Sequence, residues 1–177
     1  MQNPAGHQPE ISETAWISDK ATIIGNVYIG NNVFVGPNAV IRADETDTII
    51  KIEDNCNVQD NVIIHGTTGS KVVIGKETSL AHGCIVHGPC TIGKGCFIGF
   101  GAVVFDCTLG DDVVVLHNAT VHGVTIKPSK SVPIGSVIVN ANDAANLPDL
   151  SCDLAEFKQN VIEANLELVK GYRNTKR

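Results

Sequence analysis

The stretch that decides the fold reads V-Q-D-N-V-I-I-H at residues 58–65 and, after a short insertion, S-L-A-H-G-C-I-V-H at residues 79–87. Three histidines, His65, His82 and His87, lie here among aliphatic residues that recur every six positions. The period covers most of the chain, and four residues after each aliphatic residue a small or β-branched residue follows, except at Glu45. The aliphatic positions are Ile17, Ile23, Ile29, Val35, Ile41, Ile52, Val58, Ile64, Ile74, Leu80, Val86, Ile92, Ile98, Val104, Leu109, Val115 and Val121.

Two inward positions in every six residues do not fit the 3.6-residue period of an α-helix, but they fit short strands joined by tight turns. We therefore predict a parallel β-helix, in which each coil pairs with its neighbours. The pattern resembles that of left-handed β-helix proteins, and this resemblance implies the handedness and a triangular coil of three hexapeptides. The predicted fold is mainly β: a left-handed parallel β-helix of hexapeptide repeats with a C-terminal α-helix.

The period changes near residue 146. Residues 146–177 predict one amphipathic helix with an N-cap at Ser151 and a stop at Gly171. Because a lone helix needs an apolar partner, we expect it to pack on the β-helix, which would span residues 11–145 and carry the functional site. Residues 1–10 are expected to form an N-terminal tail. The apolar positions of the helix are Leu154, Phe157, Val161 and Leu168.

The composition excludes several classes of function. A formal net charge of -6 and 13 scattered Lys and Arg residues provide no basic patch for nucleic acid or anionic lipid. We expect neither a signal peptide nor a membrane span, and therefore a cytoplasmic protein that binds no nucleic acid and no membrane. Six cysteines occur without a C-x-x-C pair. Cys56, Cys84, Cys90 and Cys96 occupy the small inward position of the repeat, where a free thiol serves as a small hydrophobic side chain.

The six-residue frame assigns the histidines to faces of a prism. If the segment G-T-T-G-S-K-V after His65 contains a loop, His65 and His87 point outward from equivalent places on the first face, one coil apart, which is about 4.8 Å. Two imidazoles so placed can share one metal at Zn–N distances of about 2.1 Å. His82 lies on the third face and points away, so it would complete a metal site with a neighbouring subunit of a homotrimer.

Other polar residues follow the same register. Arg42 stacks one coil below the first histidine, close to Asp44, whereas Gln59 and Asp60 lie on the third face one coil below His82. These two sets would line the two sides of a subunit interface. Two plainer interpretations stay open: Arg42 and Asp44 can form an exposed ion pair of little energetic value, and Gln59 and Asp60 can be ordinary turn residues.

A second pair of histidines repeats the five-residue spacing. The segment V-L-H-N-A-T-V-H at residues 115–122 places His117 on the third face and His122 on the first. The neighbour one coil below His122 is Phe105, and no hexapeptide coil clearly follows. A third ligand is therefore missing, and we interpret His117 and His122 as polar surface residues.

The sequence resembles the gamma-class carbonic anhydrases. The resemblance is carried by I-R-A-D-E at 41–45, N-V-Q-D-N-V-I-I-H at 57–65, S-L-A-H-G-C-I-V-H-G-P at 79–89 and the C-terminal helix. It implies a homotrimer with one divalent metal per subunit, bound by His65 and His87 of one chain and His82 of its neighbour. It also implies an interface role for three residues and a catalytic role near the metal-bound water for three more. These are Arg42, Asp44 and Asp60 at the interface, and Gln59, Glu45 and Asn165 in catalysis.

The implied activity is that of a carbonic anhydrase, a lyase that reversibly hydrates carbon dioxide to bicarbonate. A metal held by three neutral imidazoles keeps a position open for water and lowers the pKa of that water toward about 7, which supplies hydroxide at neutral pH. We expect Zn²⁺, although Fe²⁺ and Co²⁺ also accept imidazole ligands.

One departure from the family and two alternative functions remain. The family prototype has a long acidic loop with a proton-shuttling glutamate after the first histidine, whereas the loop after His65 is short and contains no carboxylate, which leaves Glu45 or buffer to export protons. The first alternative is a hexapeptide-repeat acyltransferase that binds acyl-coenzyme A between subunits and uses a histidine as base. The second is a non-catalytic structural subunit with an anhydrase-like fold.

Overall fold

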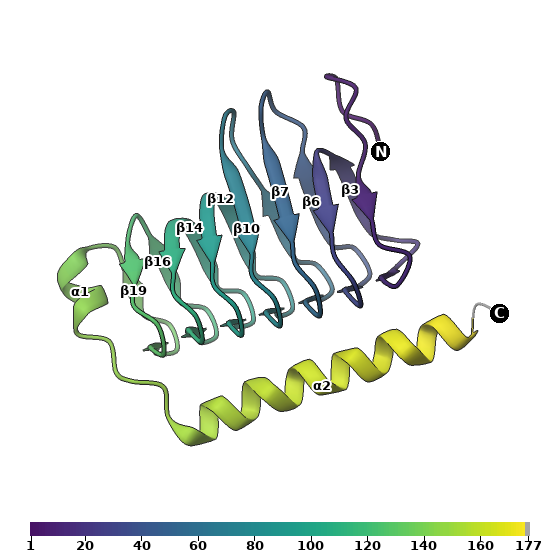
Figure 1. The fold of residues 1–177 in the computed structure, drawn as a ribbon. Coiled ribbons are helices and arrows are strands. Elements are labelled where there is room, and N and C mark those ends of the chain that lie inside the picture. The colour runs from purple at the N-terminus through teal and green to yellow at the C-terminus, as the bar shows by residue number, and fades with distance from the viewer. Residues whose placement is uncertain (176–177) are drawn as a thin grey trace.

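Inward-pointing aliphatic residues set the architecture, because tight turns between them bend the chain into a solenoid. The structure is a computed structural model and describes residues 1–175. It confirms a mainly β fold of hexapeptide repeats: parallel strands form a β-solenoid of about seven turns, and a helix follows at the C-terminal end (Figure 1).

The strands lie on three faces and pair in parallel with strands of the neighbouring coils, on both sides within the β-solenoid and on one side at its two ends. The first face contains β3 (Thr22–Gly25), β6 (Val40–Ala43), β9 (Ile63–His65), the first half of β12 (Ile85–Ile92), the first half of β14 (Val103–Leu109), β16 (Thr120–His122) and β19 (Val137–Ile138). The second face contains β1 (Glu10–Ile11), β4 (Val27–Ile29), β7 (Ile49–Ile52), β10 (Lys71–Ile74), the second halves of β12 and β14, and β17 (Thr125–Ile126). The third face contains β2 (Trp16–Ile17), β5 (Phe34–Val35), β8 (Asn57–Val58), β11 (Ser79–Leu80), β13 (Phe97–Ile98), β15 (Val114–Val115) and β18 (Ser131–Val132).

Two insertions interrupt the regular coil. Regular neighbours are three hexapeptides apart, as Trp16 and Phe34 are, but Phe34 pairs with Asn57, and Asn57 pairs with Ser79. The extra residues lie at the corner between the first and second faces. We call residues 44–48 the first insertion and residues 66–70 the second insertion; they occupy the same corner of consecutive coils.

The repeat continues one coil beyond the predicted end. Ile126, Val132 and Ile138 point inward and are 1%, 0% and 7% exposed, so a coil does follow His122. The expectation that none clearly follows was wrong: the chain takes a five-residue step from Val121 to Ile126, like the earlier step from Val104 to Leu109, and the repeat then continues at Val132 and Ile138.

The cysteines of the repeat are structural, as predicted. Burial raises the pKa of the Cys56, Cys84, Cys90 and Cys96 thiols to about 12, which keeps them protonated and unreactive. Cys107, which the repeat did not explain, is also buried, because a register shift in β14 pairs it with Cys90.

The N-terminal residues pack on the first coils. Residues 1–9 contain no strand, but Asn3 is buried and its Nδ2 donates a hydrogen bond to the Ala43 carbonyl, 3.1 Å away. The Gly25 amide donates to the Met1 carbonyl. The expected tail is therefore hydrogen-bonded to the β-solenoid.

Two helices follow the last coil. The short helix α1 (Ala141–Ala145) lies at the end of the β-solenoid, where Ala144 and Leu147 are buried. The helix α2 (Cys152–Thr175) then runs back along the whole β-solenoid and packs on β2, β5 and β11 of the third face (Figure 1). No helix among residues 1–175 has the length and apolarity needed to cross a membrane.

The ends and the buried side of α2 differ in part from the prediction. The Ser151 hydroxyl accepts a hydrogen bond from the Leu154 amide, which confirms the N-cap, but the helix passes through Gly171 to Thr175. It continues because Tyr172 stacks on Trp16 with ring centroids 4.3 Å apart, and this contact offsets the roughly 1 kcal/mol helix penalty of one glycine. The buried residues are Ile162, Asn165 and Val169, whereas Leu168 is exposed, as is Phe157, although its ring contacts Phe97 edge-on.

Removal of the Tyr172 ring should therefore loosen the end of α2. We expect Tyr172→Ala to lower the free energy of unfolding by about 1–2 kcal/mol, because the ring is only partly buried. Urea unfolding followed by circular dichroism measures the change, and Tyr172→Phe, which keeps the stacked ring, is the control. Equal stability of all three proteins would show that the stacking does not anchor the helix.

Candidate metal site

His65 and His87 form a close pair on the first face. Strands β9 and β12 pair in register with His65 beside His87, as the six-residue frame predicted. Each histidine follows an inward aliphatic residue, Ile64 or Val86, so both rings point outward. Nδ1 of His65 lies 3.1 Å from Nε2 of His87, a separation that fits two nitrogen ligands of one tetrahedral ion about 2.1 Å from each.

The surroundings of the pair set the tautomer of His87 and the pKa of His65. Nδ1 of His87 lies 3.0 Å from the Gly88 carbonyl oxygen, which can only accept, so Nδ1 carries the proton and Nε2 directs its lone pair toward Nδ1 of His65. Burial lowers the pKa of His65, and the positive charge of Arg42 and the neighbouring His87 lower it further. The lowered pKa favours the neutral form of His65, which is the form that binds a metal ion.

His82 lies at the corner between the third and first faces. It follows β11 and precedes Gly83, which turns the chain with a φ of 67°, a value that favours glycine. Nδ1 of His82 is 2.6 Å from Oδ1 of Asp60, one coil below, and the His82 side chain is 51% exposed. The carboxylate orients the ring and leaves Nε2 facing outward, an arrangement typical of metal-binding histidines.

The three histidines do not meet within one chain. Among residues 1–175, no three His, Cys, Asp or Glu side chains lie close enough together to hold a metal ion. His82 lies in the turn that follows β11 of the third face, whereas the other two histidines lie in β9 and β12 of the first face. A three-histidine centre would therefore need His82 from a second copy of the chain.

The first insertion places two carboxylates beside His65. Arg42 pairs in register with His65, as predicted, and its Nη1 lies 3.2 Å from Oδ2 of Asp44. Oδ1 of Asp44 is 3.5 Å and Oε1 of Glu45 is 3.6 Å from Nε2 of His65. Arg42 and Asp44 thus form an ion pair within the chain, next to the histidine pair.

Glu45 is held by the second insertion. Its Oε2 accepts hydrogen bonds from the backbone amide of Thr68 at 2.7 Å and from the Thr68 hydroxyl at 2.9 Å. These two bonds lower the pKa of Glu45, so its carboxylate is ionised at neutral pH. Sequence reasoning did not identify Thr68, since only the contact between the two insertions reveals it.

Several buried polar atoms around the histidines make no hydrogen bond in the part of the chain that the structure describes. Within residues 1–175, Oε1 of Gln59, Oδ1 of Asp44 and Nε2 of His65 are buried and make no hydrogen bond. Buried polar atoms are normally paired, so these atoms fit a site that is completed by an ion, by water or by another chain. The donor set of neutral imidazoles with nearby carboxylates suits a divalent metal such as Zn²⁺.

Asn165 lies apart from this group. It is buried in α2, and its Nδ2 donates to the Val161 carbonyl of the same helix at 2.8 Å. No hydrogen bond within residues 1–175 links it to His65, His82 or His87.

The second histidine pair differs from the first. His122 stacks on Phe105, which contacts His87 edge-on, so a phenyl ring separates the two histidines along the first face. His117 stacks on Phe100, and its Nδ1 accepts a hydrogen bond from the Phe100 amide at 3.1 Å. The proton of neutral His117 is therefore on Nε2, which makes it a donor and not a ligand.

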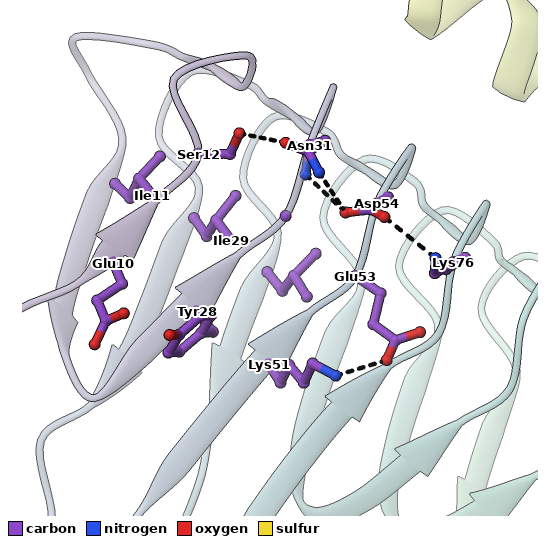
Figure 2. Close-up of a pocket in the computed structure, with 12 residues that line it drawn as sticks. Glu10, Ile11, Ser12, Tyr28, Ile29, Asn31, Lys51, Glu53, Asp54 and Lys76 are labelled. Carbon is purple, nitrogen blue, oxygen red and sulfur yellow. Dashed lines mark hydrogen bonds and ion pairs between the residues drawn. The ribbon is translucent and has the colours of Figure 1, made fainter.

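A groove of about 480 Å³ lies elsewhere, on the second face along β1, β4 and β7 (Figure 2). Four of its five charged side chains form ion pairs: Lys51 pairs with Glu53 at 2.8 Å and Lys76 with Asp54 at 3.2 Å, which leaves the carboxylate of Glu10 beside Tyr28 (Figure 2). No candidate site residue lines this groove.

Comparison with known proteins places these features in a family. The family model "Bacterial transferase hexapeptide (six repeats)" matches residues 9–43 and 71–105. The carbonic anhydrase of Methanosarcina thermophila is 36% identical over 98% of this chain and 78% of its own length. The chain belongs to the gamma-class carbonic anhydrase family.

Other relatives of this gamma-class chain have different names. The carboxysome assembly protein CcmM of Nostoc sp. is 37% identical over 93% of the chain, which spans only about a third (31%) of that longer protein. A solved structure of a putative acetyltransferase from Bacillus cereus superposes with a TM-score of 0.85, covers 98% of this chain and 96% of its own, and is 22% identical. That likeness concerns the fold alone.

Proposed function

We propose that the chain is an active carbonic anhydrase that reversibly hydrates carbon dioxide in a homotrimer. His65 and His87 of one subunit and His82 of its neighbour would hold one divalent metal at each interface. The observation that carries this proposal is the His65–His87 pair, whose nitrogens are 3.1 Å apart and whose third partner, His82, is oriented by Asp60 toward the outside of the chain.

The residues around the pair would divide the chemistry. A bound divalent metal, Zn²⁺ by its ligand type, with Fe²⁺ or Co²⁺ possible, acts as a Lewis acid and supplies hydroxide from water at neutral pH. The neutral histidines leave the charge of the metal undiminished. Oε1 of Gln59, which makes no hydrogen bond within residues 1–175, would accept a hydrogen bond from the attacking solvent and so aim the lone pair of the solvent oxygen at carbon dioxide. Glu45, ionised beside His65, would receive the proton that leaves the site.

Three further residues would complete the interface. The Arg42 side chain is 43% exposed, and its guanidinium has N–H donors besides the one that faces Asp44. These donors would bind a carboxylate of the neighbouring subunit. Asp60 would hold His82 at the angle that the neighbouring pair requires. Asn165 would approach the site from α2 of an adjacent subunit.

The decisive experiment measures metal content and carbon dioxide hydration on the same protein. We expect about one metal ion per chain in protein purified without chelator, and stopped-flow hydration well above the buffer blank that is lost with a chelator and restored by Zn²⁺. Absence of metal together with binding of acyl-coenzyme A would favour the acyltransferase.

A structural role is the second candidate, and the similarity to a carboxysome assembly protein favours it. This candidate predicts bound metal and a stable trimer with hydration no faster than the blank. Because the metal content is measured on the same sample, the outcome separates an inactive metal centre from a site that was never formed.

A further inference from the structure

We infer that Thr68 is a positioning residue of the proposed metal site, because it holds the Glu45 carboxylate beside His65. The inference rests on the proposed function. It assigns the short second insertion a role that needs no carboxylate of its own: a hydroxyl and a backbone amide orient Glu45, one of the carboxylates that the first insertion places beside His65.

The geometry of the contact is specific. Both donors of Thr68, the amide at 2.7 Å and the hydroxyl at 2.9 Å, bind the same oxygen, Oε2 of Glu45. The other oxygen, Oε1, is thereby directed toward Nε2 of His65 at 3.6 Å. Hydrogen bonds to a carboxylate are short and strong, so two on one oxygen fix the rotation of the group.

The two insertions are joined at more than this point. The Gly69 amide donates to the Thr46 carbonyl at 2.8 Å, and the hydroxyl of buried Thr48 donates to the Thr67 carbonyl at 2.9 Å. A Cβ on Gly66 would lie 2.6 Å from Cγ2 of Thr48, so glycine permits this close approach. Thr68 therefore lies in a loop that is itself hydrogen-bonded to the first insertion.

Without its two hydrogen bonds to Thr68, Glu45 would lose its orientation. Its side chain is 41% exposed, and a glutamate so exposed occupies several rotamers unless bonds select one. A freely rotating carboxylate is beside His65 for only part of the time, which slows any proton transfer through it.

The alternative is that the contact only fastens the loop. Thr68→Val removes the hydroxyl at nearly constant volume, and Thr68→Ser restores it. Thr67→Val is the matched control, because the Thr67 hydroxyl makes no hydrogen bond to Glu45 within residues 1–175. A fastening role would change stability and leave kinetics alone, whereas positioning changes the turnover in weak buffer.

We expect Thr68→Val to lower turnover about threefold to tenfold in weakly buffered solution, with rescue in Thr68→Ser and no change in Thr67→Val. The loss should disappear in a Glu45→Gln background, because Thr68 acts through that carboxylate. A loss that persists there, or turnover equal to that of the unaltered protein, would overturn the inference.

Crystal structures of the metal-loaded proteins supply a readout independent of activity. Oε1 of Glu45 should face His65 in the unaltered protein and in Thr68→Ser, and should leave this position in Thr68→Val. If the unaltered protein does not hydrate carbon dioxide, the proposed function fails, while the crystal structures still show whether Thr68 orients Glu45. An unmoved Glu45 carboxylate in Thr68→Val contradicts the positioning role of Thr68.

Discussion

Replacement of His82 by alanine is expected to empty every metal site of the trimer while the β-solenoid stays folded. The ring lies at an exposed corner, where it contacts Asp60 and the exposed ring of Phe100, so its loss removes a ligand and these two surface contacts and leaves the core intact. Metal content should fall from about one per chain to less than about a tenth, and carbon dioxide hydration to the buffer blank. Elemental analysis and stopped-flow assays measure both quantities.

His117→Ala is the matched control for this substitution. His117 occupies the equivalent corner of the third face two coils further on, above Phe100, and it also follows an inward aliphatic residue by two positions. The control protein should keep its metal and its turnover. Equal metal loss in both proteins would point to a general disturbance of the face.

A mixture of two inactive variants tests whether the site is shared between chains. His82→Ala and His87→Ala should each be empty alone, because each interface then lacks one ligand. In mixed trimers, an interface with intact His82 from one chain and intact His65 and His87 from the other regains its site. Random mixing restores about one quarter of the sites. Mixed trimers that stay empty, beside an unaltered protein that binds metal, would place all the ligands in one chain.

The sequence was sufficient for the frame of this site. An inward residue at each sixth position fixes which neighbours face outward, and consecutive coils repeat the position in register. The pairing of His65 with His87, of Arg42 with His65, and of Phe105 with His122 therefore followed from counting. The prediction stopped one coil early, at the step from Val121 to Ile126. This step is one residue shorter than the period, and period alone cannot distinguish a short coil from the end of the repeat.

Contacts between the two insertions could not be predicted from the six-residue period. Glu45 and Thr68 both lie in insertions, where no period relates one residue to another, and their hydrogen bonds depend on how the two loops stack. The buried side of α2 was predicted only in part: Val161 packs on the buried cluster around Phe97, but the most deeply buried apolar residues lie on an adjacent stripe that satisfies the same helical pattern. The choice of Ile162 and Val169 over Phe157 and Leu168 is made by the third face against which the helix packs.

The second large effect is expected from Glu45→Gln. Glutamine has the shape of glutamate and can still accept the hydrogen bonds of Thr68, but it has no charge and cannot take up a proton. If Glu45 receives protons from the site, turnover in weakly buffered solution should fall about tenfold or more. Metal content should stay at about one per chain, because Glu45 is not a ligand in the proposed site.

Buffer dependence identifies the step that is lost. Imidazole or another small base can carry protons in place of a missing side chain, so rising buffer concentration should return the turnover of Glu45→Gln toward that of the unaltered protein. Glu53→Gln is the control: its carboxylate pairs with Lys51 on the second face and lies outside the site, so it should leave turnover unchanged at every buffer concentration. The low pKa of Glu45 also predicts how the effect depends on pH. Because the carboxylate is charged throughout the neutral range, the ratio of the turnover of Glu45→Gln to that of the unaltered protein should stay constant as the pH rises above 7. Turnover of Glu45→Gln equal to that of the unaltered protein in weak buffer would exclude Glu45 from proton export and leave that step to solvent alone.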